Sequence, residues 1–311
     1  MLFGTKEQPE ISDEIVSYDP STLARGRVRK GEVESLFESL GNRRAARIVR
    51  SLPERGGFLD PDAVDRLLVN VHCEMQRMSE EFQHGRRVLE LLSALVAAVG
   101  AKRRLRVVDL GCGTGYVIRW LAACGRVGGR VELIGADYNA ALVGEARRLA
   151  GEEGLDCSFV VANAFRLAEP ADVLLSTGVL HHFRGEALVE LFRQHEASRA
   201  SGFLHFDFQP SPIAPLGSWL FHRIRMRQPL ARHDGVLSAV RAHPAPTLLS
   251  AARAGAPSFR ASMYATRLWG TPIPRAFHAV VGARGEVWER FVRGLGRRAA
   301  RLDDREGGGA R

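Results

Sequence analysis

Three glycines and an acidic residue near the middle of the chain form the pattern that points most directly to chemistry. The glycines stand two apart, at Gly111, Gly113 and Gly115. They follow Asp109 at the end of an apolar run over residues 105–110, which predicts the first strand of a parallel sheet, and helical spacing resumes over residues 116–123. Glycines at such a joint let the backbone turn sharply and leave room for a ligand against bare main chain. The joint predicts a cofactor loop, and a tight structural turn is the alternative.

The spacing of these glycines separates two classes of cofactor. The fingerprint for nicotinamide and flavin dinucleotides, Gly-x-Gly-x-x-Gly, would need its third glycine at Tyr116. An acidic residue followed by Gly-x-Gly-x-Gly instead resembles the first motif of the class I S-adenosylmethionine-dependent methyltransferases. The resemblance implies that Asp109 and the loop, Cys112 included, hold the aminoacyl end of S-adenosylmethionine, because its ammonium group suits a carboxylate partner.

Two further predicted strands end in polar residues that could form hydrogen bonds to a nucleoside. The strand over residues 131–137 ends in Asp137, about where a doubly wound fold places the acid that binds both ribose hydroxyls. The alternative role for Asp137 is to cap the next helix, a role for which Asn139 competes. Residues 158–165 predict another strand; the family commonly has Asp where Asn163 stands, and the resemblance implies that Asn163 accepts a hydrogen bond from the adenine amino group. The neighbouring residues assigned to the cofactor are Tyr138 and Ala164.

A histidine pair follows the fourth predicted strand, residues 172–177, whose last residue Thr177 we also assign to the cofactor. The segment over residues 178–183 resembles the His-His segment of many small-molecule methyltransferases. This places His181 and His182 near the reaction zone, and one of them is a candidate general base for an acceptor hydroxyl because imidazole titrates near neutrality. Adjacent side chains cannot both point the same way, so the alternative is a structural hydrogen-bonding role. His182, further past the strand end, is the better catalytic candidate of the two.

Composition limits the range of functions. The chain has 311 residues, of which 45% are hydrophobic, enough for a full core in one large α/β domain with appended helices. The formal charge of +9 invites a nucleic-acid interpretation, but 41 of the 44 basic residues are arginines scattered over nearly every segment. A nucleic-acid partner is therefore not expected. No window approaches the roughly 20 apolar residues of a membrane span.

The cysteines give no sign of a metal site or of disulfides. They are Cys73, Cys112, Cys124 and Cys157, without paired spacing of the kind that binds zinc. Their scatter indicates free thiols in a reducing cytoplasm, and Cys112 is better explained as a small residue in tight space than as a nucleophile. No metal ligands are assigned.

The segments around the core complete the predicted architecture. Residues 1–100 form an N-terminal helical region, and residues 101–285 form a doubly wound, Rossmann-like α/β domain. We predict a mostly parallel seven-stranded sheet, a helical cap insertion around residues 209–246, and a closing antiparallel hairpin over residues 258–283. Residues 286–311 read as a basic tail that is partly disordered.

The resemblance implies an enzyme that moves a methyl group from S-adenosylmethionine to an oxygen or carbon of a small molecule, such as a phenol, a quinone precursor or a polyketide-like product. The segment after strand four lacks the Asn/Asp-Pro-Pro-aromatic tetrad of enzymes that methylate exocyclic amines of bases. No cluster of carboxylates follows that strand to hold magnesium, so a metal-free reaction is expected. An RNA or protein methyltransferase and a non-catalytic cofactor-binding protein are the alternatives, and the oligomeric state is left open.

Overall fold

An eight-stranded sheet forms the centre of the computed structural model, which describes residues 5, 7–100, 103–128, 130–167, 170–265, 267 and 275–303. Its strands are β3 (Leu105–Leu110), β4 (Val131–Asp137), β5 (Ser158–Val161), β6 (Val173–Thr177), β7 (Gly202–Phe208), β8 (Phe259–Tyr264), β9 (Phe277–Arg284) and β10 (Leu302–Asp303), in the order β10-β8-β9-β7-β6-β3-β4-β5. Strands β3 to β7 are parallel, and β9 is antiparallel to both β7 and β8. The predicted doubly wound sheet with a closing antiparallel hairpin is confirmed, although the short edge strand β10 makes eight strands where seven were expected.

The chain reverses its direction of travel across the sheet at β3. It runs outward from β3 through β4 to β5, then crosses back to place β6 on the other side of β3. Open α/β sheets bind ligands outside the carboxyl ends of their strands at such a reversal. The glycine segment after β3 and the histidine segment after β6 therefore meet at this point.

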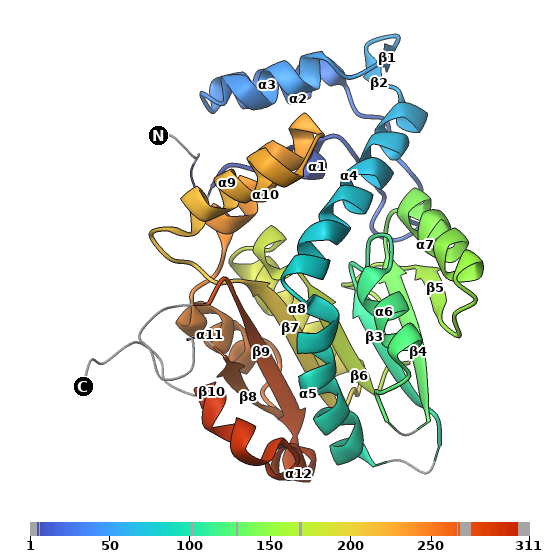
Figure 1. Ribbon diagram of the computed structural model, residues 1–311. Coiled ribbons are helices and arrows are strands. Elements are labelled where there is room, and N and C mark those ends of the chain that lie inside the picture. The colour runs from blue at the N-terminus through green and yellow to red at the C-terminus, as the bar shows by residue number, and fades with distance from the viewer. Residues whose placement is uncertain are drawn as a thin grey trace.

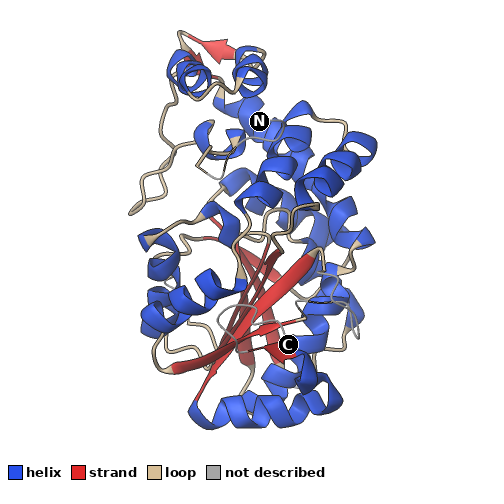
Figure 2. Ribbon diagram, turned by 90° about the vertical axis from the view of Figure 1, so that its left-hand side faces the viewer, coloured by secondary structure: helices blue, strands red, loops and turns tan. Residues whose placement is uncertain are grey.

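Helices cover both faces of the sheet, as Figure 2 shows. One face carries α5 (His84–Val99), α6 (Tyr116–Cys124), α7 (Ala140–Glu152) and α12 (Gly285–Leu295), and the other carries α8 (Glu186–Ala197) and α11 (Ala245–Gly255). Successive residues of β3 serve opposite faces, because Val107 packs with α5 and α6 while Val108 packs with α8 and α11. A strand that is buried on both sides is mostly apolar along its length, and this pattern is what allowed β3 to be predicted from the sequence.

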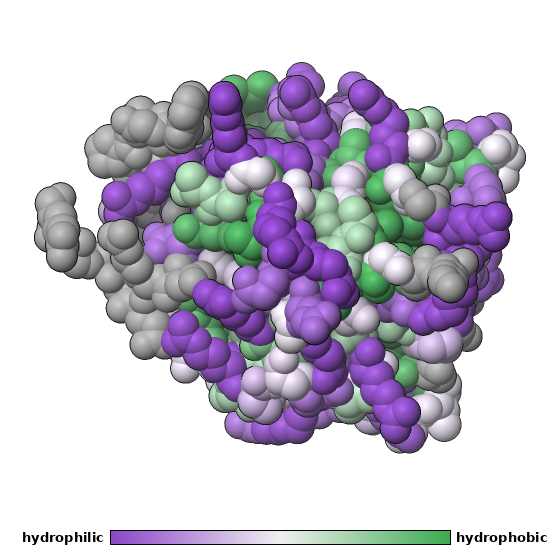
Figure 3. Space-filling model, turned by 90° about the horizontal axis from the view of Figure 1, so that it is seen from below, coloured by the Kyte–Doolittle hydropathy of each residue, from purple (hydrophilic) through white to green (hydrophobic). Residues whose placement is uncertain are grey.

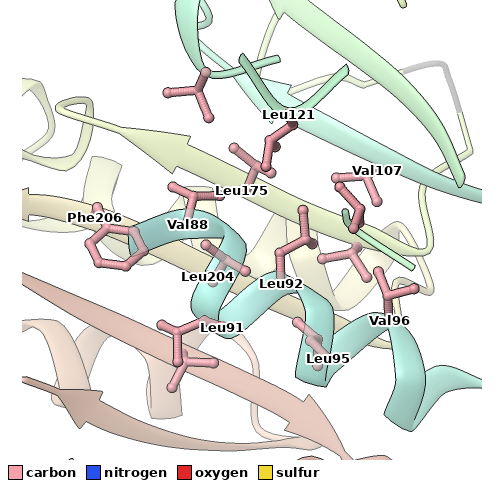
Figure 4. Packing of buried hydrophobic residues seen from close by; sticks show 14 of the residues in the cluster. Val88, Leu91, Leu92, Leu95, Val96, Val107, Leu121, Leu175, Leu204 and Phe206 are labelled. Carbon is pink, nitrogen blue, oxygen red and sulfur yellow. The ribbon is translucent and has the colours of Figure 1, made fainter. Parts of the chain in front are cut away.

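Helix α5 shows clearly how the spacing of apolar residues in the sequence determines which face of a helix packs on the sheet. The apolar residues on the inner face of this helix recur at spacings of three and four and are buried: Val88, Leu91, Leu92, Leu95 and Val96. Figure 4 shows this face of the helix against Leu175, Leu204 and Phe206 of the sheet. Burying each leucine contributes about 2 kcal/mol. Helix α5 therefore belongs to the layer that covers the sheet, although it lies within the predicted N-terminal region of residues 1–100.

A third group of elements lies beyond the carboxyl ends of the parallel strands (Figure 1). The N-terminal part contributes α1 (Ile11–Glu14), α2 (Lys30–Ser39), α3 (Arg43–Arg50), β1 (Glu54–Arg55), β2 (Phe58–Leu59) and α4 (Pro61–Glu81), and the segment after β7 contributes α9 (Ala214–Arg225) and α10 (Pro229–Arg241). Phe37 of α2 and Leu230 of α10 belong to the same buried hydrophobic cluster. Helix α4 begins after Asp60, whose carboxylate accepts hydrogen bonds from the N–H groups of the first turn.

The C-terminal part differs from the predicted tail. The segment from residue 286 continues helix α12, in which Trp288, Phe291 and Leu295 are buried against the core shared with α5. A short 3-10 helix and β10 follow as far as Asp303. The prediction missed this helix because the basic composition of the whole segment 286–311 was given more weight than an apolar stripe at spacings of three and four. The last predicted tail residues, 304–311, lie outside the described residues.

Hydrophilic and hydrophobic side chains are interspersed at the end of the molecule where the parallel strands begin (Figure 3). Several arginines are paired with carboxylates from other elements, as Arg103 is with Asp172 and Arg104 with Asp156. Within the described part of the chain, no helix combines the length and the apolar character that crossing a bilayer requires.

Candidate active site

The glycine loop between β3 and α6 depends on backbone conformations that favour glycine. Gly111, Gly113 and Gly115 have φ angles of 67°, 55° and 76°. The N–H groups of Gly111 and Cys112 both donate to the Ala136 carbonyl oxygen, at 2.8 and 3.1 Å, and this fastens the loop to β4. The local sequence therefore produces the sharp turn that was predicted.

Each glycine of the loop also has a close neighbour. A Cβ at Gly111 would lie 2.8 Å from Val179, and one at Gly115 would lie 2.3 Å from the ring of Phe159. A Cβ at Gly113 would lie 2.5 Å from Nδ1 of His72, which projects from α4. The expectation that Gly113 faces only a ligand is therefore incomplete, because an N-terminal helix contacts this part of the loop.

Asp137 lies at the end of β4, and its carboxylate is hydrogen-bonded to the glycine loop. Its carboxylate accepts hydrogen bonds from the N–H groups of Gly113 and Asn139, both at 2.9 Å. Burial raises the pKa of Asp137, although these main-chain donors act in the opposite direction. Helix α7 is capped by Asn139, whose side chain accepts from Ala141 and Leu142, so Asp137 is not the cap.

Three buried polar atoms beside the loop have no hydrogen-bond partner among the described residues. They are Asp109 Oδ1, Asn139 Nδ2 and Thr177 Oγ1. Burial, and to a smaller extent the nearby charge of Asp137, raise the pKa of Asp109 well above its usual range. Unpaired buried polar groups are costly, so their concentration at one place indicates that a polar ligand completes them. An ammonium group beside Asp109 would supply both a hydrogen-bond donor and the missing charge.

A cavity of about 550 Å³ joins these features. Its lining includes all of the predicted site residues except one: Asp109, Gly111, Cys112, Gly113, Asp137, Tyr138, Asn163, Ala164, Thr177, His181 and His182. The exception is Gly115, which begins α6 and packs against Phe159. The structure thus brings the sequence-predicted residues together and gives Gly115 a structural position.

The histidine pair occupies a 3-10 turn, Leu180–His182, at the end of β6. The carboxylate of Asp207 on β7 accepts from the His181 N–H at 2.9 Å and lies 2.7 Å from His181 Nδ1. His182 Nδ1 lies 2.9 Å from the Asp13 carboxylate. Burial alone would lower the pKa of His182, but Glu10 and Asp13 outweigh it and raise the pKa to about 9.

The N-terminal segment, residues 7–25, lies against the cavity at several points. The Asn163 amide donates to the Pro20 carbonyl oxygen at 2.9 Å, and its Oδ1 accepts from the Phe165 N–H at 2.9 Å. Both ends of the Asn163 side chain are therefore already hydrogen-bonded within the protein, including the oxygen that was expected to accept from adenine. The rings of Tyr18 and Tyr138 meet edge to face at 5.0 Å.

Comparison with known proteins agrees with this geometry. Residues 107–200 match the family model described as a methyltransferase domain. The chain is 29% identical over 167 residues to demethylmenaquinone methyltransferase of Thermus thermophilus, a stretch that covers 49% of this chain and 73% of that protein. It is 36% identical over 87 residues to trans-aconitate 2-methyltransferase of Mycobacterium ulcerans, covering 28% of this chain and 30% of that protein. The solved structure of the plantazolicin methyltransferase BpumL in complex with S-adenosylhomocysteine superposes on this chain with a TM-score of 0.50 and 12% sequence identity. The match covers 71% of this chain and 96% of the BpumL chain.

The chain is a class I S-adenosylmethionine-dependent methyltransferase. Its cofactor is S-adenosylmethionine, as the glycine loop predicts. The family match spans β3 to α8 and so contains the loop, Asp137 and the histidine pair. Much of the remaining cavity wall of this methyltransferase comes from outside the match.

Away from the glycine loop, one wall of the methyltransferase cavity is largely apolar. Phe208 and Phe277 approach to 4.7 Å between ring centroids, and His84 lies 4.6 Å from Phe277. Burial, followed by the charge of Arg87, lowers the pKa of His84 to about 3, so this ring is neutral near pH 7. Methionine side chains from α4 complete this wall, namely Met75 and Met78.

Sequence reasoning missed several residues of the methyltransferase cavity. Glu10, Asp13 and Tyr18 belong to no motif, and their partners are distant in sequence; Asp13 and His182 are 169 residues apart. His72 left one usable signal, because it follows Leu68 by four residues and so places a polar group on the apolar face of α4.

Proposed function

We propose that this methyltransferase methylates an oxygen or carbon atom of a small molecule with an apolar, ring-containing body. One observation carries the proposal: the polar recess at the glycine loop and the aromatic wall formed by Phe208 and Phe277 belong to one cavity. The volume of about 550 Å³ lies within the usual range for small-molecule pockets, roughly 300–1,000 Å³.

We assign the cofactor to the polar half of this cavity. Asp109 and the loop main chain would hold the aminoacyl end, and the carboxylate of Asp137 would accept hydrogen bonds from the ribose hydroxyls. Since the side chain of Asn163 already bonds Pro20 and Phe165, we assign recognition of adenine chiefly to the main chain at Ala164. Tyr138 would lie along the edge of the nucleoside, where Tyr18 already contacts it.

The acceptor belongs in the apolar half. Of the two relatives, one is named for a demethylated menaquinone and the other for trans-aconitate. An aromatic and methionine-rich wall suits a quinol or phenol ring better than a small tricarboxylate, because an acid would also meet the carboxylates of Glu10 and Asp13, which line the same cavity. We therefore favour a phenol or a quinone precursor as the acceptor class.

Methyl transfer needs a nucleophile held in line with the methyl–sulfur bond, and most of the rate enhancement comes from that positioning and from exclusion of water. His182 was the predicted base, but a ring whose pKa lies near 9 carries a proton at neutral pH. We propose that the histidine pair holds the acceptor in place and that His181, fixed by Asp207, positions its neighbour.

Calorimetry and an acceptor screen test the proposed function. S-adenosylmethionine and S-adenosylhomocysteine should bind the full chain, and NAD should not. Labelled methyl should then appear in a panel of phenols and quinols and not in a panel of aliphatic acids. Transfer only to RNA or protein would refute the proposed acceptor class, and cofactor binding without transfer to any panel would support a non-catalytic protein.

A further inference from the structure

The two histidines and Glu10 form a cluster with a consistent orientation. The rings of His181 and His182 lie 4.4 Å apart between centroids, with 33° between their planes. Each ring has its Nδ1 beside an aspartate, Asp207 at 2.7 Å and Asp13 at 2.9 Å. The Nε2 atoms therefore face elsewhere, and both approach the carboxylate of Glu10.

The distances in this cluster suit a shared ligand. His181 Nε2 lies 3.6 Å from Glu10 Oε1, and His182 Nε2 lies 4.0 Å from Glu10 Oε2. One ligand atom from each of the three residues lies within 4.8 Å of the others. A zinc ion about 2.0–2.2 Å from each ligand would space tetrahedral ligands roughly 3.4 Å apart, so on metal binding the ligand atoms would draw together from separations of 3.6, 4.0 and at most 4.8 Å.

We propose that Glu10, His181 and His182 bind one divalent transition-metal ion, with the remaining coordination positions directed to the acceptor. Two imidazoles and a carboxylate form a ligand set that zinc uses in catalytic sites, where a further position stays open. The aspartates behind both Nδ1 atoms match the carboxylate partners that orient metal-bound histidines.

Charge and burial favour a cation here. Glu10 and His181 are each 3% exposed. With neutral imidazoles, the carboxylates of Glu10, Asp13 and Asp207 exceed the single guanidinium of Arg241 by two negative charges, which one divalent ion would balance. Arg241 is already committed to Asp13 and to the carbonyl oxygens of the histidine pair, and the Ser238 hydroxyl donates to Glu10 at 3.0 Å.

This inference rests on the proposed function, because it assigns the ion to the acceptor half of the same cavity. A hydroxyl coordinated there would release its proton to solvent more readily. The oxygen lone pair would then form the bond to the methyl carbon as the methyl–sulfur bond breaks, and the electron pair of that bond would return to sulfur to leave the thioether. The ion would thus supply the activation, with His182 bound to it as a neutral imidazole.

Metal titration of the full chain tests the site without using activity. Protein stripped with a chelator should bind close to one equivalent of Zn²⁺ by calorimetry and by elemental analysis. Mn²⁺ serves as a second probe, because it has little affinity for the four free cysteines. Glu10→Gln and His182→Ala should each weaken binding of both ions by about 10-fold or more, and Asp207→Asn should do so by about 10–100-fold. Glu7→Gln, an exposed neighbour of the site, should bind as the wild type does.

The outcomes separate this inference from the proposed function. Circular dichroism confirms that each variant is folded, and S-adenosylhomocysteine affinity is measured on the same metal-free samples. Failure of the wild type to bind either ion, or unchanged binding by Glu10→Gln and His182→Ala, would overturn the metal site even if the cofactor binds normally. Should Glu10→Gln not fold, His182→Gln takes its place in the same comparison. Loss of cofactor binding by the wild type would instead refute the proposed function.

Discussion

Asp137 performs two tasks with one carboxylate: it holds the glycine loop through Gly113 and faces the cavity where we place the ribose. Asp109 differs from it, because one of its oxygens has no partner among the described residues. These two buried acids are the main side chains that we assign to binding the cofactor. Their effects on binding should differ accordingly.

Replacing Asp137 by alanine should remove a charge-assisted partner of the ribose and loosen the loop. We expect cofactor affinity to fall by about 1.5–3 kcal/mol, or roughly 10- to 150-fold. Calorimetry with S-adenosylhomocysteine measures this change. Asp156→Ala is the matched control, because Asp156 lies on the surface, with a side chain 92% exposed, and pairs with Arg104. Wild-type affinity in Asp137→Ala would show that the ribose assignment is wrong.

Cofactor affinity should also fall as the pH is lowered. The pKa of Asp109 is raised in the free protein by burial and by Asp137, whereas a bound ammonium group favours the ionised carboxylate. Protonation of Asp109 therefore competes with the cofactor, and affinity should decrease as the pH falls through the raised pKa of Asp109. Asp109→Asn should bind more weakly and lose most of this slope. An equal slope in the variant would assign the pH dependence to another group.

His182→Ala should separate catalysis from cofactor binding. If the pair holds the acceptor, turnover with an identified acceptor should fall by about 10²-fold, while the affinity for S-adenosylhomocysteine stays within a few-fold of the wild type. Turnover is measured at saturating cofactor. A variant with full activity would exclude His182 from the acceptor site, whether as a base or as a ligand.

At the scale of elements, the loop between β3 and α6 is held from two sides. Strand β4 accepts its N–H groups, and α4 lies over it with His72 close to Gly113. Arg119 of α6 strengthens this contact, because it donates to the Thr114 carbonyl oxygen at 3.3 Å and to Gln76 of α4 at 2.8 Å. The position of α4 therefore controls the shape of the cofactor half.

Gly113→Val should abolish cofactor binding, because the added side chain would collide with His72 and push α4 away from the loop. Cooperative unfolding should survive, with a loss of stability of about 1–3 kcal/mol from backbone strain. Gly154→Val is the control: its φ of 65° is also left-handed, but a Cβ there meets nothing within 4 Å. We expect similar strain in the control and normal binding. Equal loss of binding in both would mean that strain, and not the contact with α4, decides the result.

Local sequence was sufficient to predict the parallel strands and the loop, and the doubly wound arrangement was expected from the family resemblance. The run over β3 is apolar because both faces are buried, and Asn139 is a cap by residue type and position. The contacts that close the cavity could not be predicted in this way. Asn163 and Pro20 are 143 residues apart, and nothing near Pro20 in the sequence marks it as part of a site. The histidine pair was found by its motif, whereas its acidic partners Glu10 and Asp13 were not.

At the scale of the whole molecule, segments from distant parts of the chain meet over one edge of the sheet. The N-terminal segment and α10 are joined there, because the Asp234 carboxylate accepts from the N–H groups of Ile11 and Ser12 at 3.0 and 2.8 Å. Both lie above the carboxyl ends of the parallel strands, as Figure 1 shows. The cofactor and the acceptor are thus enclosed by parts of the chain that the sheet itself does not require.

Binding of S-adenosylhomocysteine should stabilise the N-terminal segment. Amide hydrogen exchange in residues 7–25 should slow by about 10-fold or more with saturating ligand, because Tyr18 and Pro20 contact residues assigned to the nucleoside. Amide exchange in α12, which contributes no residue to the lining of the cavity, should change little. Tyr18→Ala should reduce the protection selectively. Uniform slowing across the chain would indicate general stabilisation instead of a local contact.

The division of the cavity wall has a consequence for how this enzyme could acquire new substrates. The cofactor half lies within the family match of residues 107–200, while Glu10, His72, Phe277 and α10 lie outside it. Substitutions in the outer segments can reshape the acceptor pocket without altering the groups that recognise the methyl donor. Selection for a different acceptor is therefore least constrained in α10, because α4 and the N-terminal segment also contact the cofactor half, and a family of related chains would diverge in α10 first.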